Sequence, residues 1–304
     1  MKIILDTDIG SEMTDATTLC LAAISPEIEL LGVSTVTHDT LFRASVAKKF
    51  LRLLGKENIP VAAGFGKETN HEWEKQVIFP EGYKSSDLDK RQDHELILDL
   101  VEENKNDVVL VGIGTTTNIA KALEFDSNLP KKVSRLVMMG GMINQPVVNG
   151  KQIPIGFEYN FCNDNISATK IIQAEFNLTL LPGDLTFDQN DPWTAEDLNE
   201  LANINHAATQ LLVAIKDKSM IEMKKGMEKA GLPINFAKPW VNDEFTISYL
   251  IKPDLFETED VFISWKLEGK YPKILIVEKG HPITLIQKTD FPQTRKFIIE
   301  RLKM

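Results

Sequence analysis

Alternating strand and helix patterns over more than half of the chain constrain its fold more than any other feature. Short runs rich in Val, Ile and Leu, such as residues 2–8, 28–36 and 107–114, are each followed by apolar residues at helical spacing. Strands that are apolar on both faces and joined by helices are typical of a parallel sheet covered on two sides. The sequence therefore predicts an α/β fold with an open, mainly parallel sheet and helices on both faces.

The last third of the chain departs from this alternation. Residues 194–230 are predicted to be helical, residues 261–267 and 273–277 to form a late strand pair, and residues 291–303 to form a closing helix. No Ser/Gly-rich linker, internal repeat or low-complexity tract interrupts the sequence. We therefore expect a single domain spanning residues 1–304.

The charge and cysteine content narrow the class of partner. A formal net charge of −10 argues against a nucleic-acid surface, which needs a basic footprint. Cys20 and Cys162 are far apart and outside any C-x-x-C pattern, so we expect both to be reduced. No apolar run approaches the roughly 18 residues of a membrane span, and the first residues lead straight into a strand. A soluble cytoplasmic protein is expected.

Polar residues stand at the end of strand after strand. They are Asp6 and Asp8, Thr35 to Asp39, Gly114 to Asn118, Gly140 and Gly141, and Asp184. In open parallel sheets ligands bind beyond the carboxyl ends of the strands, so these residues mark the expected site edge. Two polar segments without clear periodicity, 66–92 and 223–239, are predicted to be loops, either lids of the site or mobile surface.

The stretch DTDIGSEMTDA crowds acidic side chains where the first strand gives way to a helix. Asp6, Asp8, Glu12 and Asp15 fall within ten residues. Like charges at this density repel one another unless a cation neutralises them. Carboxylates from Asp8 and Asp15, with a backbone carbonyl or a carboxylate from elsewhere, would suit Ca²⁺. The alternative is that these side chains cap the helix and are solvated.

At this point the sequence resembles the nucleoside hydrolases, the inosine-uridine-preferring N-ribohydrolases. DTDIGSEMTDA is similar to the opening motif of that family. The further matching segments are GIGTTTNIAKAL at 112–123, LVMMGG at 136–141, GFEYN at 156–160, LLPGDLT followed by TAEDL, and VNDEF at 241–245. These segments follow the family's order and cover roughly residues 1–250. The resemblance implies an open α/β sheet and a homodimer or homotetramer.

The resemblance also implies a metal site and a reaction. Asp8 would be a Ca²⁺ ligand and the general base that deprotonates a metal-bound water. Asp15 would be a bidentate ligand, Thr117 would give its backbone carbonyl, and Asp243 would complete the protein ligands. The reaction would be hydrolysis of the N-glycosidic bond of a nucleoside or a related ribosyl compound. Such a reaction builds positive charge on the sugar, which surrounding carboxylates stabilise.

The implied sugar contacts are Glu158 and Asn160 on the ribose hydroxyls, with Asp6 supporting the site from behind. The base and sugar contacts depart from the family pattern at other positions. Thr14 stands where the family has a carboxylate for the ribose 2′-hydroxyl, and Asn242 replaces a histidine that protonates purine leaving groups. His38 replaces an asparagine and is either a polar residue satisfied by the backbone or a contact of the site.

The sequence leaves two alternatives to a nucleoside hydrolase open. Thr14 and Asn242 are also compatible with a weakly catalytic homologue that binds a nucleoside or sugar without turning it over. D-x-D after the first strand, with GDLTFDQND at 183–191, suggests a Mg²⁺-dependent haloacid-dehalogenase-like phosphatase. Such a phosphatase places Gly-Thr/Val directly after D-x-D, whereas Ile9, Gly10 and Ser11 follow it here. The sequence leaves the base and the sugar open.

Overall fold

A nine-stranded sheet forms the centre of the molecule. The computed structural model describes residues 1–66, 88–148, 151–186, 192–229, 231 and 234–303. The strands of the sheet are β1 (Lys2–Thr7), β2 (Glu29–Thr35), β3 (Val61–Ala63), β4 (Val108–Gly112), β5 (Arg135–Met139), β8 (Leu178–Leu181), β9 (Phe256–Glu268), β10 (Tyr271–Val277) and β11 (His281–Thr289). They are ordered β10-β9-β11-β8-β5-β4-β1-β2-β3. The sheet is parallel from β3 to β11, whereas β9 and β10 pair antiparallel, which confirms the predicted fold class.

The late strand pair is present, but the sequence analysis missed the third late strand. β11 inserts between β8 and β9, with Ile283 opposite Leu178 on one side and Val261 on the other. Only three residues of β11 pair with β8. Of the others Ile286 is buried, whereas Pro282, Gln287 and Lys288 are exposed. The apolar run that marks a fully buried strand is therefore short here.

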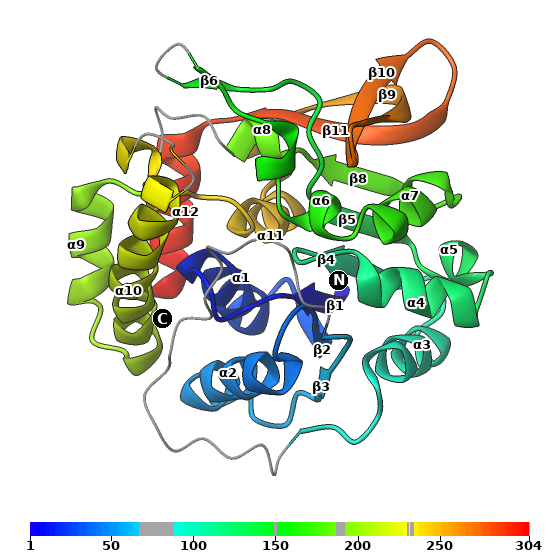
Figure 1. The fold of residues 1–304 in the computed structure, drawn as a ribbon. Helices are drawn as coiled ribbons and strands as arrows, with labels where there is room; N and C mark the ends of the chain where they lie inside the picture. The colour runs from blue at the N-terminus through cyan, green and yellow to red at the C-terminus, as the bar shows by residue number, and fades with distance from the viewer. Residues whose placement is uncertain (67–87, 149–150, 187–191, 230, 232–233, 304) are drawn as a thin grey trace.

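Helices cover both faces of the sheet (Figure 1). They are α1 (Met13–Ile24), α2 (Thr40–Leu53), α3 (Asp93–Glu103), α4 (Thr117–Phe125), α5 (Leu129–Lys132), α6 (Asn160–Asn163), α7 (Asn165–Gln173), α8 (Gly183–Thr186), α9 (Ala195–Asn203), α10 (Ala207–Lys229), α11 (Glu244–Ile251) and α12 (Phe291–Leu302). α1, α2, α10, α11 and α12 pack over one face, and α3, α4, α5 and α7 over the other. The closing helix predicted at 291–303 is thus confirmed as α12.

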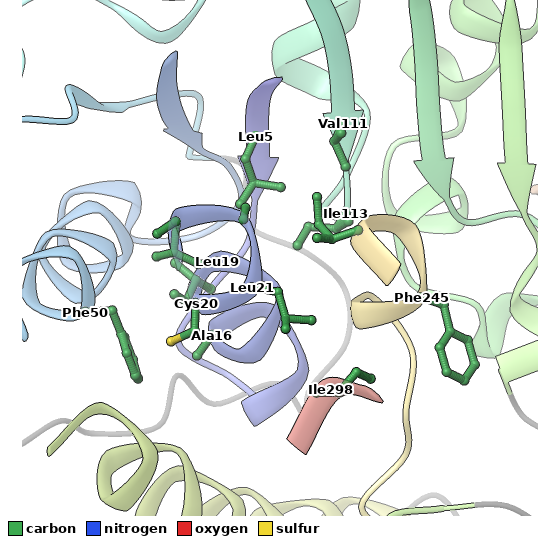
Figure 2. Packing of buried hydrophobic residues seen from close by; sticks show 14 of the residues in the cluster. Leu5, Ala16, Leu19, Cys20, Leu21, Phe50, Val111, Ile113, Phe245 and Ile298 are labelled. Atoms are coloured by element: carbon green, nitrogen blue, oxygen red, sulfur yellow. The ribbon is translucent and has the colours of Figure 1, made fainter. Parts of the chain in front are cut away.

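The larger core lies around α1, between the sheet and the helices of the first face. Leu19, Cys20 and Leu21 of α1 are inaccessible to solvent, and Leu5 of β1 and Phe245 of α11 belong to the same cluster (Figure 2). Both cysteines are free thiols, as expected. Because α1 is buried nearly all round, the residues that begin it are held firmly at the end of β1.

The shorter elements lie near the ends of the parallel strands. A two-stranded ribbon is formed by β6 (Val147–Val148) and β7 (Lys151–Gln152), and single 3₁₀ turns by η1 (Ile155–Phe157), η2 (Ile234–Phe236) and η3 (Pro253–Leu255). The helices predicted within 194–230 are confirmed as α9 and α10. The overlapping loop predicted at 223–239 is wrong for its first seven residues, which continue α10 to Lys229. Most of the loop predicted at 66–92 falls outside the described residues. Among the helices that the structure describes, none has the length and apolar character needed to cross a membrane.

Candidate active site

One pocket opens beyond the carboxyl ends of β1, β4 and β5, at the sheet edge where the sequence analysis expected a site. We call its polar side the acidic floor, made of Asp8, Glu12, Asp15, Glu158, Asn160 and Asp243. We call its other side the α10 wall, made of Phe157, Tyr159, Glu222, Met223, Met227 and Trp240. The floor is built by loops that follow the strands and by the starts of α1 and α11. The wall comes from the η1–α6 segment, α10 and the chain before α11.

Two aspartates of the floor come from the β1–α1 connection. Asp8 and Asp15 are 7% and 5% exposed. Asp15 Oδ1 accepts a hydrogen bond from the Thr7 hydroxyl at 2.6 Å, which fixes the carboxylate against the end of β1. The pKa of Asp15 is raised well above its ordinary value, first by burial and then by the charges of Asp8 and Asp243. The three carboxylates thus act on one another electrostatically, although Asp243 is far away in the sequence.

Asp243 is fastened to the start of α1 through Thr14. The backbone N–H of Asp243 donates to the Thr14 hydroxyl oxygen at 2.9 Å, and that hydroxyl lies 3.1 Å from Asp243 Oδ2 and 2.7 Å from Glu244 Oε2. Burial, followed by the charges of Glu244 and Asp8, raises the pKa of Asp243. Thr14 lines the pocket, but its hydroxyl is already engaged by these two carboxylates.

Glu244 is a buried carboxylate that the sequence analysis did not single out. It is inaccessible to solvent and accepts hydrogen bonds from the Thr14 hydroxyl, the Asn242 backbone N–H and the Trp193 indole N–H. It therefore holds the segment with Asn242 and Asp243 in place. Its partner Thr14 is 230 residues away, so no local pattern signals this role.

Glu158 and Asn160 complete the floor from the start of α6. Glu158 accepts the backbone N–H groups of Asn160 and Phe161 at 2.8 and 3.0 Å. Its burial raises the pKa to about 7. The amide of Asn160 donates to the backbone carbonyls of Ile113 and Met139, which end β4 and β5. Both predicted sugar contacts therefore face the same pocket as the aspartates.

Asp6 lies behind the pocket, as the predicted supporting role requires. It is inaccessible to solvent and accepts hydrogen bonds from Ser34 at 2.5 Å and from the Asn118 amide at 2.7 Å. Burial raises its pKa to about 8. Asp6 thus ties the end of β1 to β2 and to the start of α4.

Two predicted site residues do not line the pocket. Thr117 begins α4, and its hydroxyl donates to Asp164 at 2.6 Å. Ile113, four residues earlier, is the residue of that segment that lines the pocket. His38 lies in the β2–α2 connection, where Thr37 and His38 both have positive φ, and it is absent from the lining.

The α10 wall was only partly foreseen. Met223 and Met227 fall in the segment 223–239, which the sequence analysis offered as a lid of the site. Trp240 lines the pocket and is 4% exposed in a cluster with these two methionines. Ser219, Glu222, Met223 and Met227 all line the pocket from α10. The last three lie three, four and eight residues after Ser219, a spacing that aligns side chains along one face of a helix. That spacing is the signal that was available in the sequence.

The donor set suits a hard cation in its chemistry. Asp8, Asp15 and Asp243 present carboxylates to one pocket, and a dication would relieve the repulsion that raises the pKa values of Asp15 and Asp243. Within the described part of the chain, no three His, Cys, Asp or Glu side chains are already gathered as a metal site. The side chains must therefore turn toward a common point to bind Ca²⁺, which takes oxygens at about 2.3–2.6 Å.

Comparisons with known proteins identify the family of the chain and support its fold. Residues 3–295 match the family described as inosine-uridine preferring nucleoside hydrolase. The pyrimidine-specific ribonucleoside hydrolase RihA of Enterobacter sp. (strain 638) is 28% identical over 300 residues, covering 93% of this chain and 90% of its own. The inosine-uridine preferring nucleoside hydrolase of Crithidia fasciculata is 27% identical over 285 residues, covering 88% and 84%. The structure of a purine-preferring ribonucleoside hydrolase from Gardnerella vaginalis shares the fold, with a TM-score of 0.81 at 19% identity, covering 100% and 98%.

Proposed function

This chain belongs to the inosine-uridine preferring nucleoside hydrolase family, and from that premise we propose how its pocket cleaves the N-glycosidic bond of a nucleoside. The proposal is a Ca²⁺-dependent reaction in which Asp8 is the general base. The observation that supports it most directly is the gathering of Asp8, Asp15 and Asp243 with Glu158 and Asn160 around one pocket at the carboxyl ends of the parallel strands.

We assign the metal to Asp8, Asp15 and Asp243. The sequence analysis took the fourth protein ligand from the carbonyl of Thr117; we now propose the carbonyl of Ile113, because Ile113 lines the pocket and Thr117 does not. Ca²⁺ bound there would hold the sugar hydroxyls and lower the pKa of the attacking water. The preference of Ca²⁺ for carboxylate and carbonyl oxygens matches this donor set.

The protein's own groups then perform the remaining chemistry. Asp8 accepts the proton of the water that attacks C1′ of the ribose. Glu158 and Asn160 hydrogen-bond the ribose hydroxyls and orient the sugar. The negative charge of the floor stabilises the positive charge that grows on the sugar as the bond to the base breaks. Asp6, bonded to Ser34 and Asn118, keeps the end of β1 fixed while this happens.

The comparisons and the structure affect the two alternatives from the sequence differently. The family match replaces the phosphatase interpretation. The binding-only alternative remains a second candidate. Two observations favour it: the Thr14 hydroxyl is engaged by Glu244 and Asp243, and Asn242 carries no titratable proton for a leaving group.

We further propose a single domain that assembles as a homodimer or homotetramer, which light scattering coupled to size-exclusion chromatography would test.

The test is hydrolysis of uridine and inosine by the purified protein, with calcium and after treatment with a chelator. We expect free base and ribose to form only with calcium. Asp15→Ala should lose calcium binding measured by calorimetry, whereas Asp184→Asn, outside the pocket, should retain it. Nucleoside binding without any release of base, in calcium, would favour the binding-only alternative. Undiminished release in the chelator would rule out the metal.

A further inference from the structure

The charge of the pocket lining is one-sided. Carboxylates of Asp8, Glu12, Asp15, Glu158, Glu222 and Asp243 line it, whereas no Lys, Arg or His among the described residues does. A bound dication would offset only two of these charges. A pocket with this excess of carboxylates attracts cations and repels anionic groups such as phosphates.

The excess of negative charge extends to the α10 wall, where a leaving group would lie. Glu222 stands on the same face of α10 as Met223 and Met227, and these methionines pack with Trp240. Faces of aromatic rings attract cations, and Trp is the strongest of them. A carboxylate beside an indole and two thioethers is therefore suited to a flat ring that carries positive charge.

Two lysines near the α10 wall offset part of its negative charge. Lys225 pairs with Glu222 at 2.7 Å, and the Lys238 ammonium lies 5.8 Å from the centre of the Trp240 ring. Neither lysine lines the pocket. The Lys225 side chain is 64% exposed, and ion pairs this open to water are weak. They reduce the negative potential of the wall without reversing it.

Asn242 supplies an independent sign of a ligand. Its side chain lines the pocket and is 9% exposed, and its Oδ1 is buried with no hydrogen-bond partner. An unpaired buried acceptor is costly, and a ligand N–H group relieves that cost once the amide turns toward it. Asn242 thus favours a leaving group that carries an N–H donor.

We propose that this pocket is selective for ribosides whose leaving group is a positively charged N-heterocycle bearing an amide, such as an N-ribosylpyridinium carboxamide. This inference rests on the proposed function of the site. In the reaction, water adds to C1′ while the C1′–N bond breaks, and the bonding electron pair returns to the ring nitrogen. The ring leaves as a neutral pyridine, and the proton lost by the water passes to Asp8 and then to solvent.

The chemistry of this leaving group suits the residue at position 242. A neutral purine or pyrimidine needs a proton as its bond to the sugar breaks, and proton donation is typically worth about 10²–10⁴-fold in rate. The amide of Asn242 cannot donate one as an acid. A pyridinium leaves without protonation, so this requirement disappears for a cationic substrate.

Binding to the Asp8→Asn variant in calcium tests the proposal without turnover. The probes are the N-ribosylpyridinium carboxamide and its reduced, uncharged dihydropyridine form, measured by calorimetry. We expect the cation to bind about tenfold more tightly, from the attraction of a carboxylate at close range. Adding Glu222→Gln should reduce this ratio to about threefold or less. Adding Glu228→Gln, on an exposed position of α10 outside the pocket, should leave it unchanged.

Equal affinities for the two probes, or a ratio that Glu222→Gln does not change, would overturn the proposal. A second experiment, which measures turnover, distinguishes failure of this proposal from failure of the proposed function. With the unmodified protein in calcium, we expect kcat/KM for the pyridinium riboside to exceed that for uridine and inosine by at least about tenfold. Faster hydrolysis of uridine would overturn the selectivity and leave the nucleoside hydrolase function standing. Hydrolysis of none of the three would remove the proposed function, while the binding ratio would still decide the charge preference.

Discussion

The acidic floor and the α10 wall of the pocket are built in different ways. The floor comes from the β1–α1 connection, the start of α6 and the residue before α11, and all of its side chains except Glu12 are buried. Asp15 and Asn160 are hydrogen-bonded to the ends of neighbouring strands. The wall comes from one helix and two segments more distant in the sequence, and its apolar residues form a small separate cluster. The large core around α1 supports the floor, whereas the wall packs mainly on itself.

This difference in construction suggests that the floor and the wall have different functions. Hydrogen bonds to the sheet edge hold the floor residues in place, apart from the side-chain rotations that metal binding requires, and catalysis of bond cleavage needs such positioning for every substrate. A helix face with two methionines can adapt its packing to the shape of a leaving group. We therefore expect changes in the floor to affect all substrates equally, and changes in the wall to depend on the leaving group.

The largest effect is expected at Asp8. Asp8→Asn removes the proposed base while keeping the size of the side chain, so kcat should fall by about 10²–10⁴-fold. The factor should be the same for uridine, inosine and an activated riboside, because the water is deprotonated in each case. Steady-state kinetics on the three substrates, with a thermal melt as a folding control, measure it. A loss that differs tenfold between substrates would break the division between floor and wall.

The second effect tests how tightly the backbone holds Asp8. A Cβ added at Gly114 would lie 2.9 Å from the Asp8 backbone nitrogen and 2.6 Å from Val36 Cγ1. Gly114→Ala must therefore displace the β1 end, and a shift of this kind can cost about 10²-fold in kcat. The control is Gly32→Ala, whose Cβ meets the end of the Leu100 side chain in the other core. The control should lower the melting temperature with little change in kcat; equal losses of kcat would contradict the prediction.

The contrast between floor and wall also shows what the sequence could reveal. Asp8 and Asp15 were predicted because a strand end and crowded charges are local signals in the sequence, whereas Asp243 was implied only by the resemblance to the nucleoside hydrolases. Ile113, whose carbonyl we propose as a ligand, was not predicted because a backbone carbonyl leaves no trace in residue type. Glu244 was missed because its partner Thr14 is far away along the chain.

The same reasoning explains the error in α10. Residues 223–229 belong both to the predicted helix 194–230 and to the predicted loop 223–239, and the loop was expected because the segment is polar without clear periodicity. In the structure Met223 and Met227 face the pocket and a small cluster. The apolar stripe that normally identifies a helix is weak in such a segment. The fold class, in contrast, was predictable because the buried parallel strands are nearly continuous apolar runs.

A smaller effect is expected in the wall. Trp240→Leu keeps an apolar side chain but removes the ring that packs beside Met223 and Met227. Contacts between aromatic rings are worth about 0.5–1.5 kcal/mol beyond the buried area, so KM for an aromatic leaving group should rise roughly 2–10-fold. The value of kcat should change little, and substrates with a non-aromatic leaving group should be unaffected. A fall in kcat for every substrate would place Trp240 with the floor.

The smallest expected effect is a pH dependence that belongs to the floor. Burial raises the pKa of Glu158 to about 7, so its carboxyl group is protonated below that pH and accepts a ribose hydroxyl more weakly than the carboxylate does. Between pH 7 and 8 the ionised fraction rises only from about one half to nearly one, so kcat/KM should rise by roughly twofold.

Because the folded state binds this proton more tightly than the unfolded chain, the stabilising effect of the protonated group is complete below its ordinary pKa of 4.5 and is lost as pH rises through about 7. Glu158→Gln should therefore remove this step from the pH profile and from the melting temperature alike. The step should be the same for uridine and for an activated riboside, because the sugar is common to both; a step seen with only one of them would assign the titration to the leaving group and thus to the wall.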